Sequence, residues 1–304
     1  PLDMFIPMSV AKSRIILVGD HRQLPHMVDQ QIEERLKNEL KGANNGETDL
    51  SEFIDESIKK SLFEHLISIA KKLQEKDGIP RTITLNEQYR MHPVLGDYVS
   101  REFYECHRDT TILSPLPADG FSHSIPGLEN KAAVWLDIPL NMGAECISKS
   151  RSISRQSEAQ AIAKHLKQIL DNPKQELLSY GVITFYSEQV SQIRESLVEA
   201  GILSKEYENY VVSDEYIPKI KWGTMGLRIG SVDAFQGMEF DVVYLSMVRS
   251  NPAGNVGFLQ SENRLCVAMS RQKKMLIAVG DSTMLSKPKA QKSIRQLCNF
   301  YELC

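Results

Sequence analysis

Four short segments of this 304-residue chain carry residue types suited to phosphate chemistry, and each lies beside an apolar run. In residues 19–25, a Gly-Asp pair follows such a run, and Gln23 could donate to a phosphate oxygen or orient a water molecule. In residues 88–93, Arg90 stands between an aromatic residue and a turn that ends in Pro. Such an arginine is either one half of a structural ion pair or a clamp on phosphate. For residues 19–25, the alternative is simply a strand followed by a turn. Residue type alone does not decide between the two interpretations in either segment.

The other two segments combine a glycine, a carboxylate and arginines. Residues 230–251 contain two apolar runs around a turn, so the bare backbone of Gly237 and the carboxylate of Glu239 project from one loop. In residues 263–274, Arg264 and Arg271 are seven positions apart. On a helix, this spacing of two turns places both arginines on one face. An arginine near a helix end is also a favourable partner for the helix dipole, which is the plainer interpretation.

Buried strands and amphipathic helices must position these segments. Apolar, β-branched runs predict buried strands at residues 15–18, 182–185, 242–245 and 275–279. Apolar residues recur at helical spacing within residues 62–73, 159–169 and 190–197. Strands that alternate with helices predict an α/β fold, with a mostly parallel sheet covered by helices on both faces. Open sheets of this kind place their binding sites where strands end.

The composition excludes several classes of protein. The chain has 42% hydrophobic and 25% charged residues, and no apolar run approaches the roughly 18 residues of a membrane span. The five cysteines are scattered, which indicates neither a disulfide framework nor a zinc site and favours a reducing compartment, the cytoplasm or the nucleus. The net charge of −3 argues against bulk attraction of nucleic acid. Because residues 211–304 hold 12 Lys and Arg against 8 Asp and Glu, we expect any such contact in a local groove.

The four segments, in this order, resemble a known set of helicase motifs. They look like motifs III, IV, V and VI of superfamily 1, in the order Gly-Asp-x-x-Gln-Leu-Pro, Gln-Tyr-Arg-Met-His-Pro, Val-Asp-x-Phe-Gln-Gly-x-Glu-x-Asp-x-Val and Asn-Arg-x-x-Val-Ala-x-Ser-Arg. The group that they resemble includes the nonsense-mediated-decay helicase and the Okazaki-fragment-processing helicase-nuclease. The resemblance covers nearly the whole chain and implies a RecA-like α/β fold of the P-loop NTPase type.

In that family, two RecA-like domains clamp ATP between them. By this resemblance, Gln23 senses the γ-phosphate and Asp20 positions the loop that carries it. Arg90 is expected to be an arginine finger, and Tyr89 is expected near the adenine. Guanidinium groups brought in by domain closure would stabilise the charge that phosphoryl transfer spreads over the γ-phosphate oxygens. Closure of the cleft would then be coupled to hydrolysis.

The resemblance implies further nucleotide contacts from the third and fourth segments. It places Gly237 close to the phosphates and Glu239 on the ribose. Arg271 would be the second arginine finger. The bound nucleotide is expected to be ATP with Mg²⁺.

A second set of residues resembles the part of the family fold that touches single-stranded DNA or RNA. The candidates for strand contacts are Thr184, Tyr186, Ser231 and Arg249, whose hydroxyls and guanidinium could reach phosphates and sugars. For Tyr186, the alternative is that it is simply a half-buried core aromatic. Nothing in these residues distinguishes RNA from DNA.

The sequence departs from the family pattern in one important way. It contains no G-x-x-x-x-G-K-[ST] phosphate loop and no Asp-Glu-x-x-Gln ahead of motif III, the segments that would supply the phosphate cradle and the Mg²⁺ carboxylates. We therefore expect the chain to begin just after the Walker B segment. Residues 1–84 would be the C-terminal remnant of the first RecA-like domain and residues 85–304 the second. The missing N-terminal RecA-like region is an expected partner, and the chain alone is expected to be inactive.

Three functions are compatible with these patterns. The first is the C-terminal motor portion of an ATP-dependent helicase, which supplies arginine fingers and part of the strand track. The second is a non-catalytic module, derived from a helicase, that binds nucleic acid or docks a partner. The third is a nuclease, suggested only by Asp137 and Glu145 with Lys149, whose spacing matches no metal-dependent pattern.

Overall fold

The computed structural model describes residues 8–24, 62–174, 176–221 and 226–304. The chain divides into two compact units, Pro1–Leu85 and Asn86–Cys304, which we describe separately. The assignment of these two parts to successive RecA-like domains stays a prediction. The irregular loop predicted at residues 40–52 lies outside the described residues.

The first unit contains the helix α4 (Leu62–Asp77), as the helical spacing of its apolar residues predicted. Gly78 directly follows the helix, and its φ is 72°, a value that a residue without a Cβ adopts readily. The amide of Gly78 closes the last turn by donating to the carbonyl of Gln74 at 2.8 Å. Just beyond, Arg81 forms an ion pair with Asp77.

The strand predicted at residues 15–18 is wrong. These residues have no regular secondary structure, and Ile16 and Val18 are 85% and 84% exposed. A parallel strand is stabilised by hydrogen bonds to its neighbours and by helices packed on its faces. No other part of the described chain pairs with residues 15–18, so the apolar run has no sheet to join.

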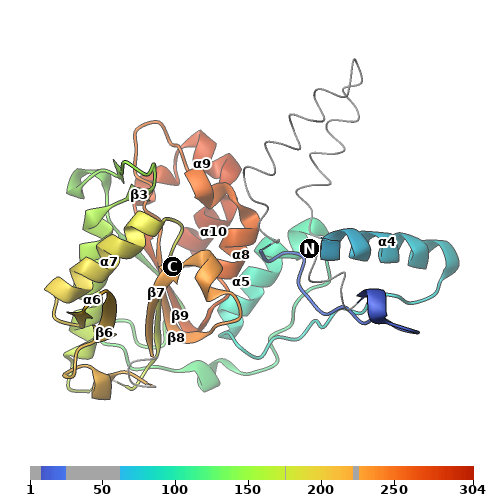
Figure 1. Ribbon diagram of the computed structural model, residues 1–304, viewed down its shortest axis with the longest axis horizontal. Coiled ribbons are helices and arrows are strands. Elements are labelled where there is room, and N and C mark those ends of the chain that lie inside the picture. The colour runs from blue at the N-terminus through green and yellow to red at the C-terminus, as the bar shows by residue number, and fades with distance from the viewer. Residues whose placement is uncertain (1–7, 25–61, 175, 222–225) are drawn as a thin grey trace. The chain divides into compact units, whose positions relative to one another are not determined.

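The second unit is built on a five-stranded sheet in which all neighbouring strands are parallel (Figure 1). In spatial order the strands are β1 (Ala133–Asp137), β9 (Gln272–Gly280), β8 (Phe240–Ser246), β4 (Tyr180–Thr184) and β7 (Leu227–Ser231). Three of these strands, β4, β8 and β9, are apolar runs that the sequence predicted as buried strands, and almost every residue in them is buried.

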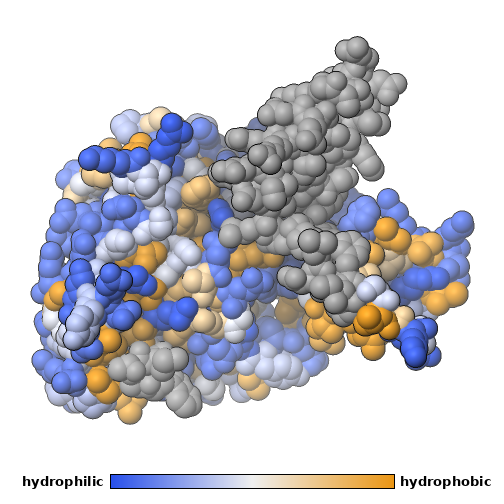
Figure 2. Space-filling model, in the orientation of Figure 1, coloured by the Kyte–Doolittle hydropathy of each residue, from blue (hydrophilic) through white to orange (hydrophobic). Residues whose placement is uncertain are grey.

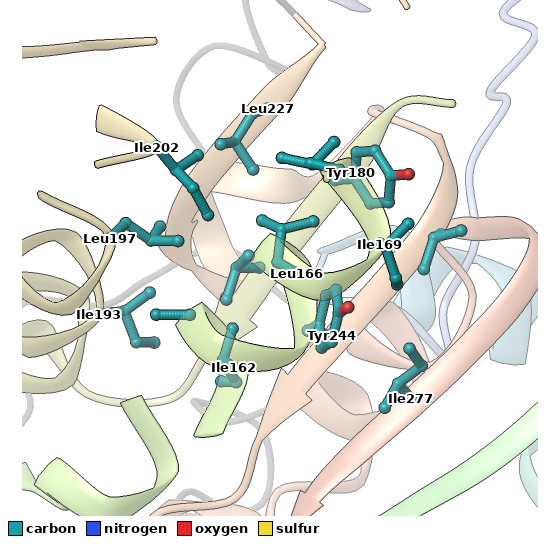
Figure 3. Close-up of a cluster of buried hydrophobic side chains, with 14 of the residues drawn as sticks. Ile162, Leu166, Ile169, Tyr180, Ile193, Leu197, Ile202, Leu227, Tyr244 and Ile277 are labelled. Atoms are coloured by element: carbon teal, nitrogen blue, oxygen red, sulfur yellow. The ribbon is translucent and has the colours of Figure 1, made fainter. Parts of the chain in front are cut away.

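Helices cover both faces of this sheet. On one face, α6 (Gln156–Leu170) and α7 (Ser187–Glu199) pack Ile162, Leu166, Ile193 and other residues against the strands (Figure 3). On the other lie α5 (Pro93–Phe103), α8 (Glu262–Ala268) and α10 (Arg295–Leu303) (Figure 1). Residues alternate between faces along a strand, so Tyr244 joins the core under α6 while its neighbour Leu245, equally buried, faces the opposite layer. The predicted RecA-like α/β fold is confirmed.

The remaining elements are short. They are α9 (Pro288–Ser293), the hairpins β2 (Cys146–Ile147) with β3 (Ile153–Ser154) and β5 (Leu203–Glu206) with β6 (Asn209–Val212), and the 3₁₀ helices η1 (Glu105–His107), η2 (Ala118–Phe121), η3 (Leu140–Met142), η4 (Ile217–Lys219), η6 (Val232–Phe235), η7 (Gly257–Gln260) and η8 (Ser282–Met284). In the view of Figure 2, the surface of the second unit is mainly hydrophilic, with hydrophobic residues scattered among the polar ones. The apolar side chains of the strands therefore lie mainly in the core.

Candidate functional site

The loop that carries Arg90 is organised by the side chain of Gln88. The Oε1 atom of Gln88 accepts hydrogen bonds from the amides of Arg90 at 3.0 Å and Met91 at 2.7 Å. Its Nε2 atom donates to the carbonyl of Met91 at 3.0 Å and to the hydroxyl of Ser114 at 2.8 Å. Gly96 makes room for this arrangement, because a Cβ at that position would lie 2.5 Å from the Gln88 Nε2 atom. The backbone around Arg90 is therefore fixed.

The same loop leads directly into α5 and is tied to the sheet. His92 is the N-cap residue of α5, and its Nδ1 atom accepts a hydrogen bond from the amide of Val94 at 3.2 Å. Pro93 occupies the first helical position, where a backbone N–H is not needed. The amide of His92 donates to the carbonyl of Lys273 in β9 at 2.7 Å. Motif IV is thereby held against the strand that follows motif VI.

The side chain of Arg90 joins three of the four motifs. Its Nε atom donates to Oε2 of Glu239 at 3.0 Å, and its Nη1 atom donates to the carbonyl of Ser270 at 3.0 Å. Lys273 approaches the other carboxylate oxygen of Glu239 at 2.6 Å. Motifs IV, V and VI thus meet where β8 and β9 begin.

The side chains of this cluster are partly exposed to solvent, and its one carboxylate, Glu239, lies between the two cations Arg90 and Lys273. The side chains of Arg90, Glu239 and Lys273 are 33%, 43% and 37% exposed. A hydrogen bond from Lys273, the largest effect, and a further one from Arg90 hold the pKa of Glu239 below its usual value, although partial burial opposes them. Glu239 is therefore ionised at neutral pH. An anionic ligand could take its place on the two cations, because guanidinium and ammonium groups bind phosphate and carboxylate alike.

A pocket of about 520 Å³ surrounds the cluster, within the usual size range of small-molecule sites. Its wall includes Tyr89, Arg90 and Glu239, three of the residues predicted to contact nucleotide. The charged residues that line it are Arg90, Lys221, Lys273, Lys274, Glu239 and Asp241. The excess of cations favours an anionic ligand.

Gly237 precedes the pocket in the turn between η6 and β8. Its φ is 79°, in the left-handed region that only glycine adopts without strain. A Cβ there would meet nothing within 4 Å, so the backbone conformation alone requires glycine in this structure. The open space beside the glycine is compatible with close approach of a ligand.

Arg271 does not line this pocket. It is 1% exposed, with Nε donating to the carbonyl of Val267 at 3.0 Å and Nη2 donating to the hydroxyl of Ser270 at 2.8 Å. The expectation that Arg264 and Arg271 share one helical face is wrong, because α8 ends at Ala268. Only residues 269–271 separate this helix from β9, and the chain must leave helical geometry there to enter the sheet.

Asp20 and Gln23 contact each other within the first unit. The Oδ1 atom of Asp20 accepts a hydrogen bond from the amide of Arg22 at 2.9 Å, and its Oδ2 atom accepts one from Nε2 of Gln23 at 2.8 Å. Such Asp-centred turns are common where a chain reverses direction. The predicted roles of these two residues toward a γ-phosphate stay predictions.

The predicted strand contacts lie at the opposite edge of the sheet, where β4, β7 and β8 end. Thr184 and Ser231 are register partners on adjacent strands. Thr184 is fully buried, and Tyr186 is 4% exposed. Neither of these two buried side chains is accessible to a nucleic acid in this structure.

Arg249 is also enclosed at this edge. It is 6% exposed, and its Nε and Nη2 atoms donate to the two carboxylate oxygens of Glu145 at 3.0 and 2.9 Å. Glu145 accepts further hydrogen bonds from the amide of Ser250 at 2.8 Å and from the side chain of Asn251 at 3.0 Å. Glu145, one of the carboxylates that suggested a nuclease, is therefore hydrogen-bonded to residues 249–251.

A second buried ion pair lies beneath that loop. Arg155 and Glu158 are both fully buried and 3.1 Å apart. Glu158 also accepts hydrogen bonds from the hydroxyl of Ser246 and the amide of Val248, each at 2.8 Å. Val248 has a φ of 68°, a strained value for a β-branched residue. The network holds the strained backbone next to Arg249.

The roles of two residues in this arrangement escaped the sequence reasoning. Lys273 supplies the closest contact to Glu239, and Glu145 holds Arg249. A lysine at the start of an otherwise apolar buried strand was a usable signal for Lys273, since buried strands rarely carry unpaired charge. Glu145 lies far from Arg249 in the sequence, and no local pattern indicated that the two would pair.

Among the described residues, one group of three could hold a metal ion. The ligand atoms of Cys106, His107 and Glu262 lie within 4.8 Å of one another. His107 and Glu262 already pair directly with each other. None of the three lines the pocket around Arg90 and Glu239.

Comparison with known proteins decides the family. A family model described as an AAA domain matches residues 58–283. The chain belongs to this AAA domain family. Its match extends over motifs IV, V and VI, so the resemblance to superfamily 1 helicases of the nonsense-mediated-decay group is confirmed.

Several curated proteins are similar to almost the whole chain. The chain is 31% identical over 289 residues to the regulator of nonsense transcripts 1 homolog of Neurospora crassa, a match that covers 94% of this chain and 22% of that protein. It is 31% identical over 290 residues to the ATP-dependent helicase NAM7 of Saccharomyces cerevisiae, covering 94% of this chain and 24% of that protein. The chain thus spans less than a quarter of the length of these two relatives.

A solved structure gives a weaker likeness. The C-terminal domain of a possible DNA helicase from Lactobacillus plantarum is 12% identical, and the match covers 64% of this chain and 88% of that one with a TM-score of 0.35. The family assignment does not depend on it. Within the parts of the chain that the structure describes, no helix has the length and apolar character needed to cross a membrane.

Proposed function

We propose that this family member is the C-terminal motor portion of an ATP-dependent superfamily 1 helicase, acting inside the cell in the cytoplasm or nucleus. The observation that supports this most is the meeting of Arg90, Glu239 and the Ser270 carbonyl at one basic pocket. The exposure of this pocket and its excess of positive charge favour a role in binding an anionic ligand over a purely structural role.

In this proposal the pocket is half of an ATP site. Arg90 serves as an arginine finger that exchanges Glu239 for the γ-phosphate, and Glu239 is then free to accept hydrogen bonds from the ribose. Arg271 is the second finger and must turn away from the Val267 carbonyl to reach phosphate. The energy for this comes from charge-assisted hydrogen bonds to phosphoryl oxygens, which strengthen as negative charge develops in the transition state. Mg²⁺ would be held by Walker residues that this sequence does not contain.

The other half of the site is proposed to come from an N-terminal RecA-like region, with Asp20 and Gln23 coupling it to the γ-phosphate. Single-stranded DNA or RNA would cross the carboxyl ends of the strands. Loss of the γ-phosphate removes the partner of the arginines and reopens the cleft, which can move two domains along a strand. The relatives named as ATP-dependent helicases support this motor role.

The test uses the complete protein. Arg90→Ala and Arg271→Ala are expected to reduce strand-stimulated ATP turnover about 10³-fold or more with only a modest loss of ATP binding, as arginine fingers do. Arg101→Ala is the matched control, because Arg101 lies on α5, is 58% exposed and does not line the pocket. Full turnover by either finger variant would contradict the assignment.

The alternative is a non-catalytic module that binds nucleic acid or docks a partner. Its supporting observation is that the sequence lacks both Walker segments. This module would bind single strands in a salt-dependent way with no effect of nucleotide. The isolated 304-residue chain is expected to show negligible ATPase activity under either proposal, so the complete protein decides between them.

A further inference from the structure

Three side chains of metal-binding type meet just after the end of α5 and at the beginning of α8. Cys106 and His107 lie in η1, which follows α5, and Glu262 is the first residue of α8. The two helices lie side by side on one face of the sheet (Figure 1). His107 and Glu262 are 155 positions apart in the sequence, so the fold brings together a thiol, an imidazole and a carboxylate that no local motif joins.

The ligand atoms of these three side chains lie close enough to share one ion. The Sγ atom of Cys106, a ring nitrogen of His107 and a carboxylate oxygen of Glu262 all lie within 4.8 Å of one another. In a tetrahedral zinc site, bonds of about 2.0–2.3 Å place two ligand atoms roughly 3.5 Å apart. Cys106 is exposed, and the side chains of His107 and Glu262 are 34% and 36% exposed, so small rotations can adjust the three atoms around an ion.

The backbone that carries the ligands is held in place. The amide of His107 donates to the carbonyl of Tyr104 at 2.9 Å. Arg108 closes η1 with a φ of 63°, and its amide donates to the carbonyl of Glu105 at 2.8 Å. The thiol of Cys266 in α8 donates to the hydroxyl of Tyr104 at 3.9 Å, which joins the residue between α5 and η1 to the helix that carries the carboxylate. Side-chain rotation alone therefore suffices to form the site.

Each ligand atom has a polar partner that a metal ion can replace. The Nε2 atom of His107 pairs with a carboxylate oxygen of Glu262, and the thiol of Cys106 donates to the carbonyl of Glu102 at 3.1 Å. A divalent cation takes the place of the proton between the imidazole and the carboxylate. It also displaces the thiol proton to water, and the thiolate can then turn from the carbonyl to the ion. One thiolate and one carboxylate neutralise a divalent charge.

We propose that Cys106, His107 and Glu262 bind one Zn²⁺ ion, with a water molecule in the fourth position. Sulfur, nitrogen and oxygen ligands together suit zinc, whereas Mg²⁺ and Ca²⁺ prefer oxygen ligands alone. The ion links the helix that follows motif IV to the helix of motif VI. This site does not depend on the helicase function proposed above, because none of its three ligands lines the pocket around Arg90 and Glu239.

The experiment titrates the 304-residue chain with Co²⁺, which occupies zinc sites and absorbs light when a thiolate binds it. Wild type is expected to show a thiolate-to-cobalt charge-transfer band that saturates at one ion per chain and disappears when Zn²⁺ displaces the cobalt. Cys106→Ser is expected to lack this band. His107→Gln and Glu262→Gln are expected to bind Co²⁺ about 100-fold more weakly or worse, because even an outer partner of a ligand is worth about 10–100-fold in metal affinity.

A control variant and a second measurement keep the test decisive. Cys146→Ser is the matched control, because Cys146 is also exposed and belongs to no group of three potential metal ligands within the described residues. It is expected to titrate like wild type. At Zn²⁺ concentrations about 100 times Kd, the Tm of wild type is expected to rise by about 5–10 °C, and that of Glu262→Gln is expected to stay nearly constant at the same Zn²⁺ concentration. Circular dichroism of each variant checks that the fold is kept.

Several results would overturn the zinc site. One is the absence of a thiolate band in wild type, and another is a band that survives in Cys106→Ser, since a different cysteine would then bind the ion. Unchanged affinity in both His107→Gln and Glu262→Gln, or loss of the band in Cys146→Ser, would also place the ion elsewhere. If Cys106→Ser does not fold, the titrations of the His107 and Glu262 variants decide by themselves.

Discussion

The two edges of the central sheet each carry an arginine paired with a glutamate, and the two pairs differ mainly in burial. At the amino edge, Arg90 and Glu239 are 3.0 Å apart, with side chains 33% and 43% exposed. At the carboxyl edge, Arg249 and Glu145 are 2.9 Å apart, with side chains 6% and 11% exposed. The contact distance therefore does not distinguish an arginine that can bind a ligand from one that cannot. The exposure of the two side chains to solvent does distinguish them.

Burial changes what each pair can do. The exposed pair costs little to separate, because water solvates both ions, and a phosphate can replace the carboxylate. The enclosed pair would leave a buried, uncompensated charge if it opened. It sits above a second buried pair, Arg155 and Glu158, that holds a strained Val248 in place. The carboxyl edge is thus a rigid support, and the amino edge is an exchangeable site.

The largest effect expected from this contrast is on stability. Glu145→Gln is expected to lower the free energy of unfolding by about 3–5 kcal/mol, because it removes the carboxylate charge that compensates the buried guanidinium of Arg249. Glu239→Gln makes the same change on the exposed pair and is expected to cost less than about 1 kcal/mol. Urea unfolding of both variants measures the difference.

The salt dependence sharpens this prediction. Salt screens exposed charges far more than buried ones, so the penalty of Glu239→Gln is expected to vanish at about 1 M salt while that of Glu145→Gln persists. Equal penalties for the two variants at low salt would show that burial does not distinguish the edges.

Much of the second unit was predictable from the sequence, because its strands are long apolar runs and its helices have clear periodicity. The first unit shows the limit of that reasoning. Residues 15–18 are as apolar as a buried strand, yet Ile16 and Val18 are exposed. An apolar run specifies a preference for burial, but a strand also needs neighbours, and these are not encoded within the run itself.

For the candidate site, the sequence indicated some residues that line the pocket and others that the structure buries. The resemblance to helicase motifs singled out Tyr89, Arg90 and Glu239, which line one pocket. It also suggested that Arg249 touches nucleic acid, whereas the structure buries this arginine against Glu145. A motif reports which residues matter without reporting which of them face solvent, because burial depends on partners far away in the sequence.

The two predicted arginine fingers also differ in burial, and replacing the buried one is expected to lower the free energy of unfolding more than replacing the exposed one. Both losses are expected to be smaller than that of Glu145→Gln. Arg271→Ala removes buried hydrogen bonds to the Val267 carbonyl and the Ser270 hydroxyl, so it is expected to cost about 1–3 kcal/mol. Arg90→Ala removes a partly exposed side chain and is expected to cost less than about 1 kcal/mol. Chemical denaturation of each variant is the measurement. A larger loss for Arg90→Ala would contradict the burial argument.

The smallest effect expected is a pH dependence from Glu239. The pKa of this carboxyl is held below its usual value by Lys273 first and by Arg90 second. A carboxyl whose pKa is lower in the folded state stabilises the fold at pH values above its unfolded pKa, about 4.3, and this contribution is lost as the pH falls through the folded pKa. The difference in unfolding free energy between wild type and Glu239→Gln, under about 1 kcal/mol, is therefore expected at neutral pH and absent in strong acid.

Carboxyl chemical shifts measured by NMR across an acid titration follow Glu239 directly. Lys273→Met is expected to raise the pKa of Glu239 more than Arg90→Met does, because the lysine hydrogen bond has the larger effect. Lys167→Met, on α6, is a control that leaves this titration unchanged, since Lys167 pairs with Asp171 and Tyr216 instead. If Arg90→Met raised the pKa of Glu239 more than Lys273→Met did, Arg90 would be the principal partner of this carboxylate. Arg90 would then not leave Glu239 readily for a phosphate, which would contradict the exchange of partners expected at the amino edge.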